Sequence, residues 1–167
     1  MKPEIILIAA MDKNHVIGKE GDIPWRGKLP ADMAHFQKLT MGGVVIMGRK
    51  TWESIPLKYR PLSGRANIVL TRDQNYVASG AHTAHDPIQV ITQDGAKHFW
   101  IIGGEELFKQ YLPVADSLEL TLVDTVTDGD VFFPSYNMAE WDIVSEEKHE
   151  PDAKNLFAYT FLRLTRK

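Results

Sequence analysis

One acidic side chain has neighbours that suit acid chemistry. Asp32 follows Pro30 in the stretch Leu29-Pro30-Ala31-Asp32-Met33. Proline fits the first turn of a helix, because the backbone N–H that it lacks would have no partner there. Apolar residues then recur at helical spacing, so we expect an inward-facing stripe of Leu29, Met33, Phe36 and Leu39. Asp32 and Phe36 are one turn apart, which directs the carboxylate toward an apolar surface.

A lone carboxylate in this position has few chemical uses. It cannot perform the hydrolysis that needs two paired carboxylates, and the sequence offers no nucleophile elbow and no Ser–His–Asp arrangement. It can hydrogen-bond a flat, amidine-like heterocycle and help a ring nitrogen to gain a proton. Desolvation would raise the pKa of Asp32 and a helix N-terminus would lower it, so the sequence leaves the balance open. The alternative is an exposed Asp32 that only complements the helix dipole.

Two junctions between a strand and a helix contain glycine and are candidate anion sites. Gly48-Arg49-Lys50-Thr51 follows the apolar run Val44–Met47, and Gly103-Gly104 follows Phe99–Ile102. Open α/β sheets bind ligands outside the carboxyl ends of their strands, and glycine lets the backbone approach a phosphate closely. Arg72 adds a cation after a third strand. Neither junction is a GxGxxG or P-loop motif, so each is equally compatible with an ordinary tight turn.

Arg65 and Trp25 are further candidates with simpler alternatives. Arg65 lies between a Pro/Gly turn and a buried strand, where it can bind a carboxylate in bidentate fashion or form a structural salt bridge. Trp25 ends a long loop beside the Asp32 helix, where it can form a wall of a cleft or belong to the core. His82 and His85 lack a third ligand at metal-binding spacing, so we predict no metal site.

The elements that must position these residues alternate along the chain. The long polar segment Asp12–Asp22 is predicted as a functional loop. Alternating strands and helices followed by a strand-rich tail predict an α/β fold in three layers. Its mostly parallel central sheet has an antiparallel C-terminal edge and helices on both faces. The predicted strands are Ile5–Ala10, Val44–Met47, Ala66–Leu70, Phe99–Ile102, Leu118–Val123, Val131–Phe133, Trp141–Val144 and Leu156–Leu164, and the predicted helices are Pro30–Thr40, Thr51–Ile55, Pro87–Gln93 and Glu105–Tyr111.

Length and composition exclude several classes of protein. The 167 residues suit a single domain over 1–167, and a net charge of −3 gives no strong attraction to nucleic acid or to an anionic membrane. The absence of cysteine excludes a disulfide framework and thiolate chemistry. The run Ile5–Ala10 is too short to span a membrane, and Met11-Asp12-Lys13 is a poor signal-peptide cleavage region. We expect a cytoplasmic protein.

A set of motifs, in order over nearly the whole chain, resembles the bacterial, chromosomal type of dihydrofolate reductase. The resemblance implies NADPH-dependent reduction of 7,8-dihydrofolate to tetrahydrofolate in one-carbon metabolism, by a monomer that binds antifolate inhibitors. The motifs are Ile8-Ala9-Ala10-Met11, Val16-Ile17-Gly18, Ile23-Pro24-Trp25, Leu29-Pro30-Ala31-Asp32, Val45 to Ile55, Arg60-Pro61-Leu62, Gly64-Arg65, Ile101-Ile102-Gly103-Gly104, Gly129-Asp130 and Phe133-Pro134.

The same resemblance implies roles for individual residues. Asp32 would hold the pterin and promote protonation of N5, with Trp25 and Thr121 completing the catalytic set. Gly103-Gly104 would form a non-proline cis peptide. The implied substrate-binding residues are Ile8, Ala9, Asp32, Met33, Phe36, Ile55, Arg60, Leu62, Arg65, Ile102 and Thr121. The implied NADPH-binding residues are Ala10, Val16, Ile17, Gly18, Gly21, Asp22, Gly48, Arg49, Lys50, Thr51, Leu70, Thr71, Arg72, Ile102, Gly103, Gly104, Glu105, Glu106, Leu107 and Phe108.

The chain departs from the family pattern at four places. Arg26-Gly27-Lys28 lengthens the spacing after Trp25, and Glu105-Glu106 places acidic groups where many members have small or basic residues. Phe108 replaces a frequent tyrosine, and His35 takes a position that is often aromatic, where we expect partial exposure. Two alternatives stay open. One is a non-catalytic pterin- or nucleotide-binding module, and the other is a related riboflavin-pathway pyrimidine reductase, against which the carboxylate of Asp32 argues.

Overall fold

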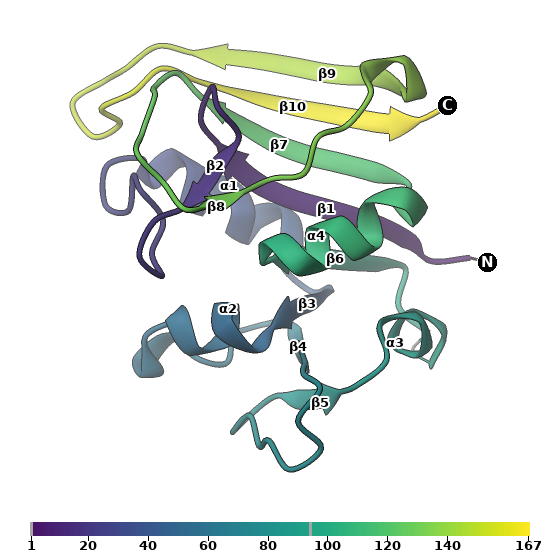
Figure 1. Cartoon of the computed structure of the whole chain (residues 1–167). Coiled ribbons are helices and arrows are strands. Elements are labelled where there is room, and N and C mark those ends of the chain that lie inside the picture. Colours follow the sequence, from purple (N-terminus) through teal and green to yellow (C-terminus); the bar gives the residue numbers. More distant parts are fainter. Residues whose placement is uncertain (1, 94) are drawn as a thin grey trace.

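The computed structural model describes residues 2–93 and 95–167, and its centre is an eight-stranded sheet (Figure 1). The strand order is β5-β4-β3-β6-β1-β7-β10-β9. Pairing is parallel from β5 to β7, and β10 runs antiparallel to both of its neighbours. The predicted parallel sheet with an antiparallel C-terminal edge is confirmed. The strands are β1 (Glu4–Met11), β3 (Val44–Gly48), β4 (Ala66–Leu70), β5 (His82–Ala84), β6 (His98–Gly103), β7 (Ser117–Val123), β9 (Trp141–His149) and β10 (Tyr159–Arg166).

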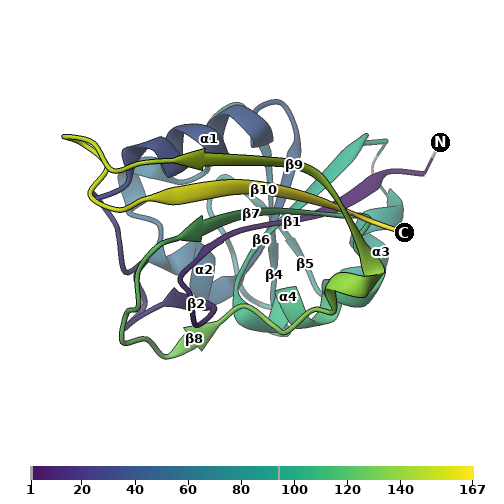
Figure 2. The ribbon, with the colours of Figure 1, turned by 90° about the horizontal axis from the view of Figure 1, so that it is seen from above.

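Helices cover both faces of this sheet, as the sequence predicts. Helices α1 (Pro30–Thr40) and α2 (Arg49–Ser54) pack on the face that carries Ile6 and Ile8 of β1. Helices α3 (Pro87–Gln93) and α4 (Glu105–Tyr111) pack on the opposite face, and Figure 2 shows α1 and α4 on opposite sides. The alternation of β1 side chains between the two clusters explains its nearly continuous apolar sequence. Within the described ranges, no helix is long and apolar enough to cross a membrane.

Several short elements lie where the sequence has no periodic pattern. Within the predicted loop Asp12–Asp22, β2 (Val16–Gly18) pairs antiparallel with β8 (Val131–Phe132). The predicted strand Val131–Phe133 therefore belongs to a separate two-stranded sheet, and the prediction that it joins the main edge is wrong. Strands this short show no alternation that a sequence pattern can detect. The described 3₁₀ turns are η1 (Leu57–Tyr59), η2 (Leu112–Val114) and η3 (Met138–Glu140).

Some predicted boundaries and one predicted core residue are corrected. Helix α2 begins at Arg49 rather than Thr51, because extended Gly48 is its N-cap. Strand β9 continues past Val144 to His149, since its pairing with β10 and not its exposed sequence sets its length. Met33 is 52% exposed, because it precedes the part of α1 that packs through Phe36 and Leu39 on the sheet.

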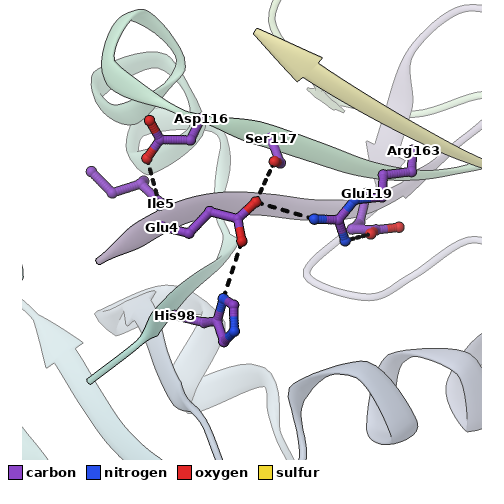
Figure 3. Close-up of polar contacts among 7 residues, drawn as sticks. All are labelled: Glu4, Ile5, His98, Asp116, Ser117, Glu119 and Arg163. Atoms are coloured by element: carbon purple, nitrogen blue, oxygen red, sulfur yellow. Dashed lines mark hydrogen bonds and ion pairs between the residues drawn. The ribbon is translucent and has the colours of Figure 1, made fainter. Parts of the chain in front are cut away.

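A network of charges joins the amino-terminal ends of β1 and β7 to β10 (Figure 3). The guanidinium of Arg163 contacts Glu119 at 2.5 Å and Glu4 at 3.1 Å. The carboxylate of Glu4 also accepts a hydrogen bond from Ser117 and lies 3.1 Å from Nδ1 of His98. Burial raises the pKa of Glu119, which is 7% exposed, and Arg163 opposes that shift. Arg163 is therefore the main counter-charge of a buried carboxylate.

We expect Arg163→Met to destabilise the protein by about 3 kcal/mol, because it leaves Glu119 buried without a counter-charge. Urea denaturation at neutral pH measures this loss. Adding Glu119→Gln to the same variant should restore much of the stability, whereas Lys148→Met, in an exposed pair with Glu146, should change little. An equal loss in the double variant would show that Arg163 acts through packing instead.

Candidate active site

The carboxylate of Asp32 lies on the first turn of α1, against strand β7. The side chain of Thr121 hydrogen-bonds to it, and Thr121 is itself buried between Ala10 of β1 and Phe161 of β10. Burial raises the pKa of Asp32, and the hydrogen bond from Thr121 opposes the shift without cancelling it. Desolvation therefore decides the balance that the sequence left open. The interpretation of Asp32 as an exposed dipole partner is wrong.

Asn155 fixes the start of this helix, and no sequence motif predicts this role. Its Oδ1 accepts a hydrogen bond from the N–H of Ala31 at 2.9 Å, in place of a side-chain cap from the N-cap residue Leu29. Asn155 is buried and is held in turn by the carboxylate of Asp152. The 124 residues that separate Ala31 from Asn155 hide this cap from any local motif.

Apolar side chains next to Asp32 come from several elements. Five of the predicted substrate-binding residues belong to one cluster around Trp52 and Trp100, namely Ile8, Phe36, Ile55, Leu62 and Ile102. Arg60 lies over the ring of Trp52, with 5.4 Å from Cζ to the ring centroid. Ala9 instead packs toward the opposite face of the sheet. The structure thus gathers most of this set on the α1 face.

Trp25 packs in a separate cluster beside the start of α1. It is 3% exposed and contacts a group that includes Leu29, Val123 and Tyr159. The core interpretation of Trp25 is therefore confirmed. Its indole N–H is buried and has no hydrogen-bond partner among the described residues. A buried donor of this kind favours a partner supplied from outside the chain.

Arg65 lies at the other end of α1 from Asp32. Its guanidinium donates to the carbonyl of Ser63 at 2.9 Å and to the hydroxyl of Thr40 at 3.1 Å. Among residues 2–93 and 95–167 it has no carboxylate within ion-pair distance, so no structural salt bridge occupies it. Asp32, Phe36 and Thr40 are spaced four residues apart on one face of α1. The ends of this face are about 12 Å apart along the helix axis.

The two glycine junctions lie against each other at the carboxyl ends of β3 and β6. A Cβ atom added to Gly48 would lie 3.9 Å from both the carbonyl oxygen of Gly103 and the nitrogen of Gly104. The hydroxyl of Thr51 would lie 3.5 Å from a Cβ on Gly103 and 3.4 Å from one on Gly104. The Gly103–Gly104 peptide is cis, as the resemblance implied, and Gly103 has a φ of 128° that favours glycine. This edge therefore places the hydroxyl of Thr51 beside the backbone of Gly103 and Gly104.

The cations predicted beside these junctions have different partners. Arg49 contacts Glu53 at 2.9 Å and Asp73 at 3.4 Å, and it lies over the ring of Tyr76. Lys50 and Arg72 are exposed and have no ion-pair partner in the described part of the chain. By sequence, His85 is a candidate only for metal binding. In the structure its Nδ1 lies 2.8 Å from the carbonyl oxygen of Thr71, beside Arg72.

Comparisons with known proteins agree with this geometry. A family model described as dihydrofolate reductase matches residues 4–166. The chain is 44% identical to the dihydrofolate reductase of Haemophilus influenzae, over 96% of this chain and 98% of that protein. It is also 42% identical to dihydrofolate reductase type 3 of Salmonella typhimurium, over 97% and 98%.

The chain belongs to the dihydrofolate reductase family. A solved structure of the enzyme from Enterococcus faecalis, complexed with NADP(H) and RAB-propyl, superposes with a TM-score of 0.91. That enzyme is 32% identical in sequence, and the match covers 100% of this chain and 98% of that chain. The likeness confirms the α/β architecture.

Besides the pairing of β2 with β8, hydrogen bonds of Asp12 and Asp130 hold the segment between β1 and α1. Asp12 is buried and accepts hydrogen bonds from the backbone N–H groups of Asn14, Val16 and Thr127 at 2.8 to 2.9 Å. Burial would raise the pKa of Asp12, but these bonds outweigh it and lower the pKa. Further along, Asp130 donates its N–H to the carbonyl of Gly18 at 3.1 Å. The segment is thus tied to residues 127–130.

Two of the four departures from the reductase pattern concern α1 and the segment before it. The Arg26-Gly27-Lys28 insertion forms a turn in which Lys28 N–H donates to Trp25 C=O at 2.9 Å and Arg26 pairs with Asp22. The turn thus draws Asp22, at the end of the segment between β1 and α1, toward the start of the helix. His35 is partly exposed, as predicted, and stacks on Phe161 with ring centroids 3.7 Å apart.

The other departures lie on α4. Leu107 and Phe108 are buried in the core below the glycine edge, and Phe108 packs 5.0 Å from the ring of Phe133. Glu105 is partly exposed and bonds to Phe132, whereas Glu106 is exposed. The two acidic side chains therefore have different environments, although they are adjacent in sequence.

We expect Asp32→Asn to be more stable than the parent protein at neutral pH. The folded protein raises the pKa of Asp32, so it binds more protons there than the unfolded chain does. The stability of the parent therefore falls as the pH rises from the unfolded pKa, near about 4, through the raised folded value. Urea denaturation of ligand-free protein across this range should show a gap that widens with pH. Asp124→Asn, an exposed control, should show no such gap. Parallel curves for Asp32→Asn and the parent would contradict the assignment.

Proposed function

We propose that this chain reduces 7,8-dihydrofolate to 5,6,7,8-tetrahydrofolate with NADPH, and that it binds antifolate inhibitors at the same site. The observation that carries the proposal is the desolvated carboxylate of Asp32, hydrogen-bonded to Thr121, in a chain of the dihydrofolate reductase family. Identities of 44% and 42% to dihydrofolate reductases over nearly the whole chain disfavour a binding module or a riboflavin-pathway reductase. We infer a single-domain, cytoplasmic monomer that acts in one-carbon metabolism.

The glycine edge fits an extended anionic cofactor. Gly48 and Gly104 are partly exposed, and the Thr51 hydroxyl lies beside Gly103 and Gly104, an arrangement that suits a pyrophosphate. The Enterococcus faecalis relative is complexed with NADP(H), which supports this cofactor here. When bound, NADPH supplies the hydride that reduces the substrate.

Several side chains complete the proposed cofactor site. Lys50 and Arg72 are the cations that we assign to the adenosine phosphates together with Thr71, since Arg49 already pairs with Glu53 and Asp73. Ala10, the β2 residues and Gly21-Asp22 flank the nicotinamide, and Leu107 and Phe108 support the edge from below. We infer that Glu106, exposed on α4, points away from the cofactor.

Asp32 performs the acid step in this proposal. Its carboxyl group holds the 2-amino group and the adjacent ring nitrogen of the pterin, and it promotes protonation of N5. The raised pKa keeps a proton available at a higher pH than an ordinary aspartate allows. Thr121 orients the carboxyl group by its hydrogen bond. The unpaired N–H of Trp25, on the same side of α1, donates to a bound molecule or water.

The remaining substrate contacts follow the face of α1. Phe36, Ile55 and Leu62 pack against the flat middle of the bound substrate, next to Arg60 and the exposed Met33. Arg65, which has no carboxylate partner in the described structure, binds the α-carboxylate of the glutamate tail. The spacing of about 12 Å between the two ends of α1 suits this extended substrate.

The proposal is tested by the loss of NADPH absorbance on adding dihydrofolate. The parent should turn over, and Asp32→Asn should lose about 10² to 10⁴-fold in kcat, the typical contribution of a positioned acid. The kcat of the parent should fall as the pH rises through the raised pKa of Asp32. Asp124→Asn should keep parental turnover. Full activity in Asp32→Asn would move the acid elsewhere, and a folded parent without turnover would reject the function.

A second variant tests whether Arg65 binds the glutamate tail of the substrate. Arg65→Met should raise the KM for dihydrofolate by about 10 to 100-fold, since it removes charge-assisted hydrogen bonds of about 1.5 to 3 kcal/mol. The KM for NADPH should not change. A reduced pterin without a glutamate tail is the control, because parent and Arg65→Met should reduce it equally well. A difference between them with this short substrate would show that Arg65 acts by another route.

A further inference from the structure

The carboxylate of Glu105 joins helix α4 to the small sheet of β2 and β8. Glu105 is the first residue of α4 and directly follows Gly104. Its Oε1 accepts a hydrogen bond from the backbone N–H of Phe132 in β8 at 2.9 Å. Its Oε2 lies 3.5 Å from Nζ of Lys109, one helical turn further along. The side chain of Glu105 is 28% exposed, and the bond lies at the surface of the protein.

Strand β8 in turn holds the segment that precedes α1. Phe132 is paired with Val16 of β2, and the next N–H, that of Phe133, donates to the carbonyl of His15 at 2.8 Å. The fit between the strands is close, since a Cβ on Gly18 would lie 3.2 Å from the Cβ of Val131. A displacement of β8 is therefore transmitted to Ile17 and Gly18, the residues assigned above to the nicotinamide.

The neighbouring acidic residue shares the contact with Lys109, but no described contact joins it to β8. Glu106 is 79% exposed, and its carboxylate has an ion pair with Lys109 at 3.8 Å as its described contact. Both residues add negative charge to the same helix turn, but only Glu105 bonds to β8. This difference separates an effect of charge near the cofactor from an effect of the hydrogen bond to Phe132.

We propose that Glu105 is a positioning residue that fixes the β2–β8 sheet relative to the cofactor edge. Its hydrogen bond to Phe132 holds β8 at α4, and β8 holds Ile17 and Gly18 over the nicotinamide. The bond also directs the carboxylate toward β8, so an acidic residue is tolerated beside the glycine edge. The inference rests on the proposed function for the identity of the cofactor.

The test compares Glu105→Ala, Glu105→Gln and Glu106→Ala in the full chain. Backbone amide exchange, followed by NMR without ligand, reports the Phe132 N–H directly. Its protection should fall about tenfold in Glu105→Ala, because one hydrogen bond to a charged group is lost. It should return most of the way in Glu105→Gln, whose amide oxygen can still accept. Glu106→Ala should match the parent.

Titration of the same proteins with NADPH, followed by its fluorescence, measures the consequence for the site. Glu105→Ala should weaken NADPH binding by about fivefold, because only part of the free energy of the hydrogen bond to Phe132 is transmitted to the cofactor site. Glu105→Gln should restore the affinity. In turnover, the KM for NADPH should rise while the KM for dihydrofolate stays constant. Unchanged Phe132 exchange in Glu105→Ala would overturn the proposal, as would tighter NADPH binding in both Glu105 variants, because charge alone would then explain it. A parent that lacks dihydrofolate turnover would reject the proposed function but leave the exchange experiment valid.

Discussion

Desolvation of the carboxylate of Asp32 sets requirements that much of this fold meets. A carboxylate removed from water is unstable unless neighbouring groups hold it, and here the hydrogen bond from Thr121 only partly compensates. The position of the Asp32 carboxylate must therefore be fixed by the rigid packing of helix α1. Helix α1 packs its Phe36 and Leu39 on the sheet, and Asn155 caps its first turn through Ala31. The helix thus keeps Asp32 in place at a cost to stability that the core offsets.

The order of the strands brings the other parts of the site to the same edge. Strands β3, β6 and β1 are neighbours and parallel, so the residues that follow them meet beyond their carboxyl ends. This pairing brings Gly48 beside Gly103-Gly104, far along the sequence, so that a Cβ atom added to Gly48 would lie 3.9 Å from both Gly103 and Gly104. The opposite ends of β1 and β7 carry the network of Glu4, Arg163 and Glu119. The apolar middle of the strands thus separates the candidate active site at their carboxyl ends from the charge network at the opposite ends.

The sequence predicts what depends on local pattern and misses what depends on distant contacts. Helix α4 begins and ends where the sequence predicts, because glycine precedes it and its apolar residues are helically spaced. The sequence predicts β8 as a strand but not its pairing with β2, which has too few residues for a pattern. It also misses the second half of β9, which is exposed along most of its length. The cap from Asn155 and the position of His85 depend on contacts between distant segments. The family motifs name candidate site residues, but only the structure separates Arg49, which pairs with Glu53, from Arg65, which has no carboxylate partner among the described residues.

A charge in the sequence acquires its effect from the partner that the fold gives it. Glu105 and Glu106 together look unfavourable beside an anionic cofactor. The carboxylate of Glu105, however, accepts a hydrogen bond from the N–H of Phe132 and forms an ion pair with Lys109. Arg49 looks like a phosphate ligand, but Glu53 and Asp73 already neutralise it. Arg65 looks like half of a salt bridge, but among the described residues its hydrogen-bond acceptors are neutral. Since cations with neutral partners keep their charge for a ligand, the anion binding that we propose for the site depends on which cations the fold leaves without a carboxylate partner.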